Sequence, residues 1–136
     1  ITDKRMTRFN ITLDEASDFV LNCIKKMKGT EVFIPKLPSY DLDTLAKSIN
    51  PNKEVKIIGI RTGEKLHEEL ITAADFGNTL EYKDSYTIYP MGLSSKNKFN
   101  TKDDIKKSYN SNENKNFLSI KDLNNLINTQ LKNFNK

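Results

Sequence analysis

The strongest constraint on the fold is an amphipathic helix predicted near the start of the chain. Residues Thr12-Leu13-Asp14-Glu15 match a capping box, in which the Thr12 hydroxyl and the Glu15 carboxylate each accept from the other residue's amide. Gly29 is the expected end of this helix. Apolar residues recur every three or four positions between these signals, so one helical face is apolar. They are Ala16, Phe19, Val20, Cys23, Ile24 and Met27.

The following segments alternate between strand-like and helix-like patterns. Residues 30–35 predict a short strand, and residues 55–60 are apolar enough to predict a strand inside a sheet. Between them, Ser39–Asp41 offers caps for a helix that ends at Asn50-Pro51. This alternation indicates a small α/β fold.

Further along the chain, the patterns predict two helices and another strand region. A short helix is expected over residues 64–71, directly after the turn at Arg61-Thr62-Gly63. Residues 80–89 are strand-like, and Ser119 can cap a final amphipathic helix at about 119–134.

Charge divides the chain into two parts. Residues 1–91 carry 13 Lys+Arg and 14 Asp+Glu, whereas residues 92–136 carry 9 and 4. The second part also holds 11 of the 16 asparagines. We therefore expect an α/β domain over 1–91 and a polar Asn/Lys-rich tail over 92–136, loosely structured from Gly92 to Asn116.

Several classes of protein are excluded or disfavoured by residues that the chain lacks. It contains no glycine-rich phosphate loop of the usual kinds, so we expect no cofactor binding by this chain alone. Cys23 is the one cysteine and His67 the one histidine, which disfavours a metal centre. No segment approaches the roughly 18 apolar residues of a membrane span, and no secretory signal is seen, so a cytoplasmic location is expected.

The segment Arg61–Glu69 (RTGEKLHEE) carries the most specific chemistry. The Arg61 guanidinium, predicted to follow a buried strand, can grip a phosphate or carboxylate, and the Glu64 carboxylate can accept from sugar hydroxyls. The alternative is a surface Arg61–Glu64 ion pair with a capping role. His67 stands among glutamates on the predicted helix and is more simply a packed or surface residue.

A second candidate segment lies before the first helix. Arg5 and Arg8 flank a threonine and could form an anion site with the helix N-terminus, or simply a solvated basic edge strand. The tyrosines and the basic tail could suit nucleic acid, but the lysines are diluted with acidic residues and form no stripe, so no nucleic-acid partner is expected.

Together these segments resemble the C-terminal part of bacterial UDP-N-acetylglucosamine 4,6-dehydratases, which belong to the extended short-chain dehydrogenase/reductase superfamily. The resemblance rests on residues 1–3 (ITD), 5–9 (RMTRF), 11–15 (ITLDE), 32–36 (VFIPK) and 58–69 (IGIRTGEKLHEE). Asn10 and Thr62 depart from it, since the family usually has Trp and Pro at these two positions. It implies a small substrate-binding subdomain without the Rossmann N-terminal part that holds NAD or NADP. The catalytic Tyr-x-x-x-Lys sequence of that part is absent from this chain.

The resemblance also implies roles for individual residues. Thr2, Arg61 and Glu64 match positions that contact the nucleotide-sugar, with Arg61 on the diphosphate and Glu64 on the ribose. Arg8 matches an arginine that reaches the diphosphate in the wider superfamily. No catalytic, cofactor-binding or metal-binding residue is expected here.

The resemblance implies an activity for a full-length enzyme, of which this chain would be an inactive part. That enzyme would be a lyase that uses NAD(P) to dehydrate a UDP-sugar, with possible inversion at C5, for surface polysaccharide or glycan biosynthesis. A homo-oligomer is expected. The alternatives are a related nucleotide-sugar epimerase or reductase, and a non-catalytic remnant domain.

Overall fold

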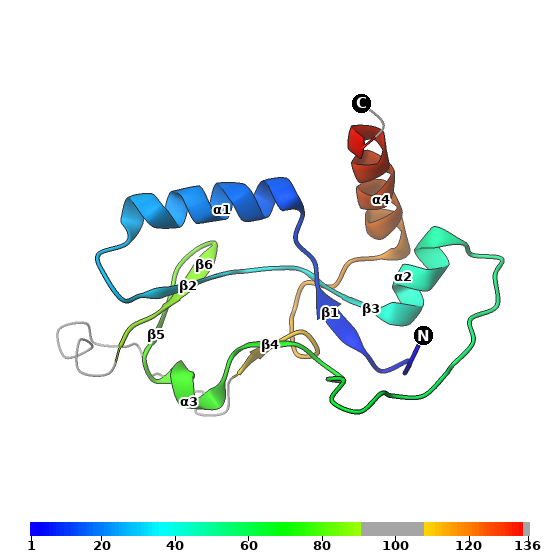
Figure 1. The fold of residues 1–136 in the computed structure, drawn as a ribbon, viewed down its shortest axis with the longest axis horizontal. Helices are drawn as coiled ribbons and strands as arrows, with labels where there is room; N and C mark the ends of the chain where they lie inside the picture. The colour runs from blue at the N-terminus through cyan, green and yellow to red at the C-terminus, as the bar shows by residue number, and fades with distance from the viewer. Residues whose placement is uncertain (91–107, 135–136) are drawn as a thin grey trace. The chain divides into compact units, whose positions relative to one another are not determined.

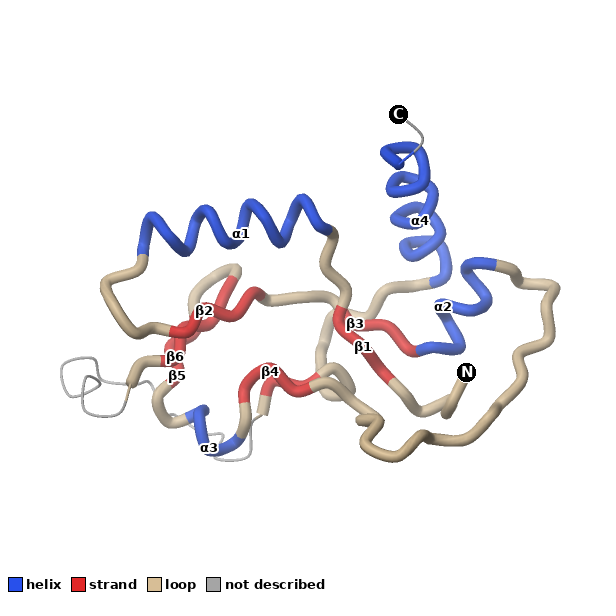
Figure 2. The backbone as a smooth tube through the Cα atoms, in the orientation of Figure 1, coloured by secondary structure: helices blue, strands red, loops and turns tan. Residues whose placement is uncertain are grey.

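The computed structural model describes residues 1–90 and 108–134 (Figure 1). The described residues form two compact units, one built from 1–10, 38–68 and 111–134, the other from 11–37, 69–90 and 108–110. Strands pair antiparallel within both units. Figure 2 shows the strands in red and the helices in blue. The elements are β1 (Thr7–Phe9), α1 (Leu13–Lys26), β2 (Val32–Pro35), β3 (Ser39–Asp41), α2 (Leu42–Ile49), β4 (Glu69–Ile71), α3 (Ala73–Phe76), β5 (Thr79–Glu81), β6 (Ser85–Ile88), β7 (Tyr109–Asn110) and α4 (Ile120–Phe134).

The first unit is built around the β1–β3 pair and two helices. Strand β1 pairs with β3 so that Thr7 lies opposite Asp41. Asp41 then caps α2, because its Oδ1 accepts from the Thr44 amide at 2.7 Å. Helix α4 packs against α2, where Leu123 is 2% exposed. The helix predicted between the caps at Ser39–Asp41 and Asn50-Pro51 and the helix predicted at about 119–134 are therefore confirmed.

The second unit contains the three-stranded sheet β2-β6-β5 and helix α1. Both halves of the predicted capping box are present, since Glu15 N donates to Thr12 Oγ1 and Thr12 N donates to Glu15 Oε2. The helix ends at Lys26, because Met27 is already extended (ψ 141°), so the predicted end at Gly29 is wrong. Cys23, predicted on the apolar face, is only partly buried.

Two predictions fail at the β4–β7 pair. The predicted helix over 64–71 is wrong, because Glu69 and Ile71 pair with Asn110 and Tyr109. The expectation of loose structure through Asn116 is also wrong from residue 108 onward, since β7 lies there and Ser111 is fully buried. Its first part, 92–107, lies outside the described residues, and the domain boundary at residue 91 stays a prediction.

The segment 55–60 is not an inner strand of a sheet, and no regular secondary structure is assigned to it. Ile57, Ile58 and Ile60 are exposed, which contradicts the predicted burial. Apolar composition shows only that a segment is suited to the inside of a sheet. An inner strand also needs a hydrogen-bonded neighbouring strand along each of its two edges. In this chain the segment's only strand-like pairing among the described residues is to the first residue, Ile1.

Candidate functional site

The turn at residues 61–64 positions the most specific predicted side chains. Gly63 has φ +80°, a left-handed conformation that glycine adopts without steric cost. The Glu64 amide donates to the Arg61 carbonyl at 3.0 Å, and the Arg61 amide donates to Glu64 Oε2 at 3.1 Å. Glu64 therefore closes a turn through the Arg61 backbone and does not cap a helix, which the structure lacks at this point.

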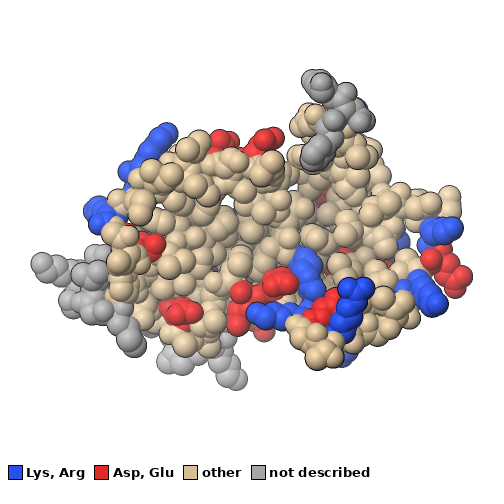
Figure 3. Space-filling model, in the orientation of Figure 1, with Lys and Arg blue, Asp and Glu red and all other residues tan. Residues whose placement is uncertain are grey.

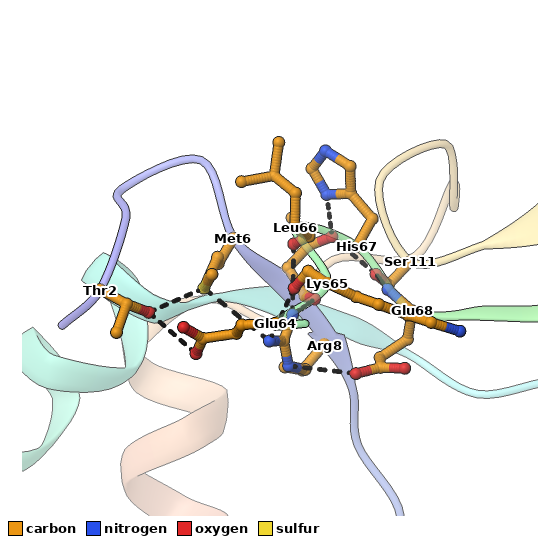
Figure 4. Close-up of polar contacts among 10 residues, drawn as sticks. Thr2, Met6, Arg8, Glu64, Lys65, Leu66, His67, Glu68 and Ser111 are labelled. Atoms are coloured by element: carbon orange, nitrogen blue, oxygen red, sulfur yellow. Dashed lines mark hydrogen bonds and ion pairs between the residues drawn. The ribbon is translucent and has the colours of Figure 1, made fainter. Parts of the chain in front are cut away.

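Thr2 joins Glu64 from a segment 62 residues away in the sequence. Thr2 is 8% exposed, and its hydroxyl donates to Glu64 Oε1 at 3.0 Å (Figure 4). The same hydroxyl lies 3.0 Å from Met6 Sδ. The Thr2 hydroxyl thus holds one oxygen of the Glu64 carboxylate, and the Arg61 amide holds the other.

Arg8 braces the loop that follows the turn. Its guanidinium donates to the Lys65 carbonyl at 3.0 Å and to the Leu66 carbonyl at 3.2 Å (Figure 4). It also lies 3.4 Å from Glu68 Oε1, and its side chain is 22% exposed. Because the Thr7 amide bonds the Leu66 carbonyl as well, β1 and the loop are held by both backbone and side-chain bonds.

Glu64 is held in its charged form. The Arg61 amide is the main cause of a lowered pKa for this carboxyl, and the Thr2 hydroxyl and the charges of Arg61 and Arg8 lower the pKa further. A carboxylate that stays ionised can only accept hydrogen bonds, which suits it to hydroxyl donors of a ligand.

The arginines of the candidate site differ in what they contact. Arg5 is engaged by Asp3, with Nε and Nη2 at 3.0 and 2.8 Å from the two carboxylate oxygens, and the hydrogen bonds from Arg5 lower the pKa of Asp3 to about 2. Arg8 is engaged as above. Arg61 is exposed, and within the described residues its guanidinium has no hydrogen-bond or ion-pair partner. On the face drawn in Figure 3, basic and acidic side chains lie among one another.

A buried polar cluster, which the sequence did not predict, lies next to the loop at residues 65–68. Thr7 Oγ1 is 2.8 Å from His67 Nδ1 and 2.6 Å from Ser111 Oγ. Ser111 Oγ also accepts from the Glu68 amide at 2.9 Å, and its own amide donates to the Glu68 carbonyl. His67 is thus a packed residue, which is one of the two roles predicted for it. It lies on a loop, so the helix predicted around it is wrong.

The described residues do not fit a dinucleotide cofactor or a metal ion. A dinucleotide sits on a glycine-rich turn between a parallel strand and a helix. Among the described residues, the glycines of positive φ are Gly59 and Gly63, and they flank an exposed segment with no helix directly after it. No cluster of three or more His, Cys, Asp or Glu side chains suited to a metal occurs in the described part.

The candidate site of this mixed α/β fold is therefore built from turn backbone, one carboxylate and arginines. The sequence pattern of the family described as "Polysaccharide biosynthesis protein" matches residues 1–90, and the chain belongs to that family. The resemblance to UDP-N-acetylglucosamine 4,6-dehydratases and to the extended short-chain dehydrogenase/reductases is confirmed.

Individual relatives agree with this assignment. The chain is 50% identical over 90 residues to a "UDP-N-acetylglucosamine 4,6-dehydratase (inverting)" of Campylobacter jejuni, which covers 66% of this chain and 27% of the relative. It is 32% identical over 92 residues to a "UDP-glucose 4-epimerase" of Rickettsia rickettsii, covering 65% and 27%. The chain thus spans about a quarter of the length of the curated relatives that it matches.

A solved structure shares the fold. The X-ray structure of Pen from Bacillus thuringiensis superposes with a TM-score of 0.75 at 32% sequence identity, covering 96% of this chain and 39% of that one. Within the described residues, no helix has both the length and the apolar character needed to cross a membrane.

Proposed function

We propose that this chain is the substrate-binding portion of a UDP-N-acetylglucosamine 4,6-dehydratase that acts in surface polysaccharide or glycan biosynthesis. The observation that carries the proposal is the joining of Thr2 to Glu64 at 3.0 Å and of Arg8 to the next two carbonyls. Motifs that are far apart in the sequence converge there. The 50% identity to the Campylobacter jejuni dehydratase over the same residues supports the substrate class.

Each proposed site residue has a distinct task in binding. Arg61 binds the diphosphate in this proposal, which is supported by a guanidinium that is exposed and free of other bonds within the described residues. Glu64, held ionised, accepts from ribose hydroxyls, and Thr2 orients that carboxylate. Arg8 adds positive charge beside the loop while its N–H groups keep the loop in place.

The chemistry of the whole enzyme requires NAD or NADP, which would take up a hydride from the sugar at C4 and return it at C6. The residues described here do not fit that cofactor, so this chain's contribution is to bind and orient the UDP-sugar. Orientation alone can lower a barrier by about 7–11 kcal/mol when the reacting groups are aligned. A cytoplasmic location and a homo-oligomeric enzyme remain predictions.

The second candidate is the substrate-binding portion of a nucleotide-sugar epimerase. The 32% identity to a UDP-glucose 4-epimerase favours it at the level of the UDP-sugar, although that identity is lower than for the dehydratase. The two candidates share the binding site and differ in product. Incubating the full-length enzyme with UDP-N-acetylglucosamine separates them, because a 4,6-dehydratase yields a 4-keto-6-deoxy sugar and an epimerase yields a C4 epimer.

Binding itself is testable on the purified 136-residue chain by titration with UDP, followed by NMR. We expect chemical-shift changes at Thr2, Arg8, Arg61 and Glu64. Arg61→Ala should raise the Kd roughly tenfold or more, because a hydrogen bond to a charged group contributes about 1.5–3 kcal/mol. Arg5→Ala is the matched control and should leave the Kd unchanged, since Asp3 already occupies that guanidinium.

Two results would contradict the proposed site. One is the absence of any response at millimolar UDP, which would leave the non-catalytic remnant as the better account. The other is an equal loss of affinity in Arg5→Ala and Arg61→Ala, which would point to general electrostatic attraction in place of a specific diphosphate contact.

A further inference from the structure

The feature that the proposed site does not use is the exposed apolar segment Val55–Ile60. The exposed fractions of three of its isoleucines are 44% for Ile57, 58% for Ile58 and 46% for Ile60. Such a near-continuous run of β-branched residues is typical of a strand with neighbours, where both of its faces are covered. Its exposure here therefore marks a surface that suits another part of the protein.

The first residue of the chain already makes one strand-like pairing with this segment. The Ile1 amino group donates to the Lys56 carbonyl at 2.9 Å, and the Ile1 carbonyl accepts from the Ile58 amide at 3.0 Å. One residue bonded to the two neighbours of its opposite residue is the pattern of a parallel ladder. Ile1 thus lies opposite Ile57, and the two backbones run in the same direction.

This pairing fixes which groups of the segment come next along the same edge. In a parallel ladder, alternate residues of a strand turn both backbone groups to one side. The Lys56 amide and the Glu54 carbonyl therefore face the same side as the Ile58 amide. Neither group has a hydrogen-bond partner within the part of the chain that the structure describes.

We propose that this edge takes a parallel β-strand formed by the residues that precede Ile1 in the whole enzyme. The inference rests on the proposed function, in which this chain is one portion of a longer protein. The residue two positions before Ile1 would lie opposite Val55. Its amide would donate to the Glu54 carbonyl, and its carbonyl would accept from the Lys56 amide.

The length of the relatives is consistent with such a strand. The 90 matched residues make up 27% of the Campylobacter jejuni dehydratase, so that relative contains further chain of the kind that the proposal requires. Pairing on this edge would also tie the added chain to the segment that leads directly into Arg61 and Glu64. The strand would then hold the proposed substrate site against the rest of the enzyme.

A short N-terminal extension of the full 136-residue chain tests the edge directly. The probe is Thr-Val-Thr-Val placed before Ile1, and the measurement is amide hydrogen exchange by NMR. Protection of the Lys56 amide should rise about fivefold or more, the factor expected for one added backbone hydrogen bond. The Ile57 amide, which faces the opposite edge, serves as an internal reference and should not change.

A matched control keeps the length and composition close to those of the probe. Proline at the position two before Ile1 removes the amide that would donate to the Glu54 carbonyl and keeps the carbonyl that would accept from the Lys56 amide. Because the loss of one bond weakens the whole pairing, protection of Lys56 should fall back toward that of the unextended chain. Equal exchange at Lys56 in all three proteins would overturn the proposal. So would a concentration-dependent dimer of the unextended chain that protects Lys56, because a second copy would then be the occupant. Neither readout depends on UDP, so failure of the proposed function is detected separately.

Discussion

Glu64 is the residue on which the candidate site converges. Its two carboxylate oxygens accept from Thr2, which lies near the start of the chain, and from the Arg61 backbone within its own turn. Removing one donor therefore loosens a carboxylate that is also proposed to bind the ribose. The protonation of Glu64 reports on this arrangement, because both donors stabilise the charged form.

The lowered pKa of Glu64 predicts how the site responds to acid. An NMR titration of its side-chain carboxyl should give a midpoint below the ordinary value of 4.5. Because the folded-state pKa is the lower one, ionised Glu64 favours the folded state above the unfolded-state pKa. This contribution is lost as the pH falls through the folded-state pKa. UDP affinity should weaken over the same acidic window.

Thr2→Val is the variant that isolates one cause of this shift. It keeps the side-chain volume nearly constant and removes the hydroxyl that donates to Glu64 Oε1. The midpoint of Glu64 should move upward yet stay below 4.5, since the Arg61 amide is the larger cause. An unchanged midpoint would mean that the Thr2 hydroxyl does not bond the carboxylate in solution.

The residues of the site differ in how far the sequence could predict them. The turn at Arg61–Glu64 depends on a local glycine and a short motif, so the sequence alone predicts the turn and the side chains that it presents. The bonds from Arg8 to the carbonyls of Lys65 and Leu66 could not be predicted in this way, because those carbonyls lie 57 and 58 residues further along the chain. No sequence pattern encodes a side chain that bonds a distant backbone.

At the scale of elements, helix starts were the most predictable features. Thr12 and Asp41 cap their helices as expected, and Ser119 bonds Asp122 at the start of α4. All three are bonds between residues three apart, and such bonds are encoded locally. The strand predictions failed where the partner strand is distant in the sequence. Strand β4 forms because it pairs with β7, about 40 residues away, and the local sequence carries no signal for that pairing.

The capping box of α1 offers a test at this scale. Thr12→Ala removes the acceptor for the Glu15 amide and should lower the free energy of unfolding by about 1 kcal/mol, with faster exchange in the first turn of α1. Thr12→Ser keeps the hydroxyl and should retain most of that stability. Urea denaturation of the two variants measures the difference, and equal losses would show that the hydroxyl does not cap the helix.

At the scale of the whole chain, the described part of the C-terminal region is part of the fold. Ser111 is fully buried and bonds both Thr7 and Glu68, which belong to the body of the first unit. Asn124 donates to the Ser48 carbonyl at 2.9 Å, 76 residues away. Composition suggested a tail, because Asn and Lys are usually solvated, but a few buried side chains suffice to order a polar segment.

Leu123 gives the sharpest test of that conclusion. It is 2% exposed where α4 meets α2, so Leu123→Ala leaves a cavity and should lower the free energy of unfolding by about 2–5 kcal/mol. Leu131→Ala makes the same chemical change on the same helix at a side chain that is 55% exposed, and should cost within about 0.5 kcal/mol. Urea denaturation followed by NMR, with the amide signals of Thr7 and Glu64 as local probes, should show both residues unfolding along with α4. If Leu123→Ala unfolds α4 alone and leaves those probes unchanged, the C-terminal helix is an appendage, and the loop of the proposed site is stable without it.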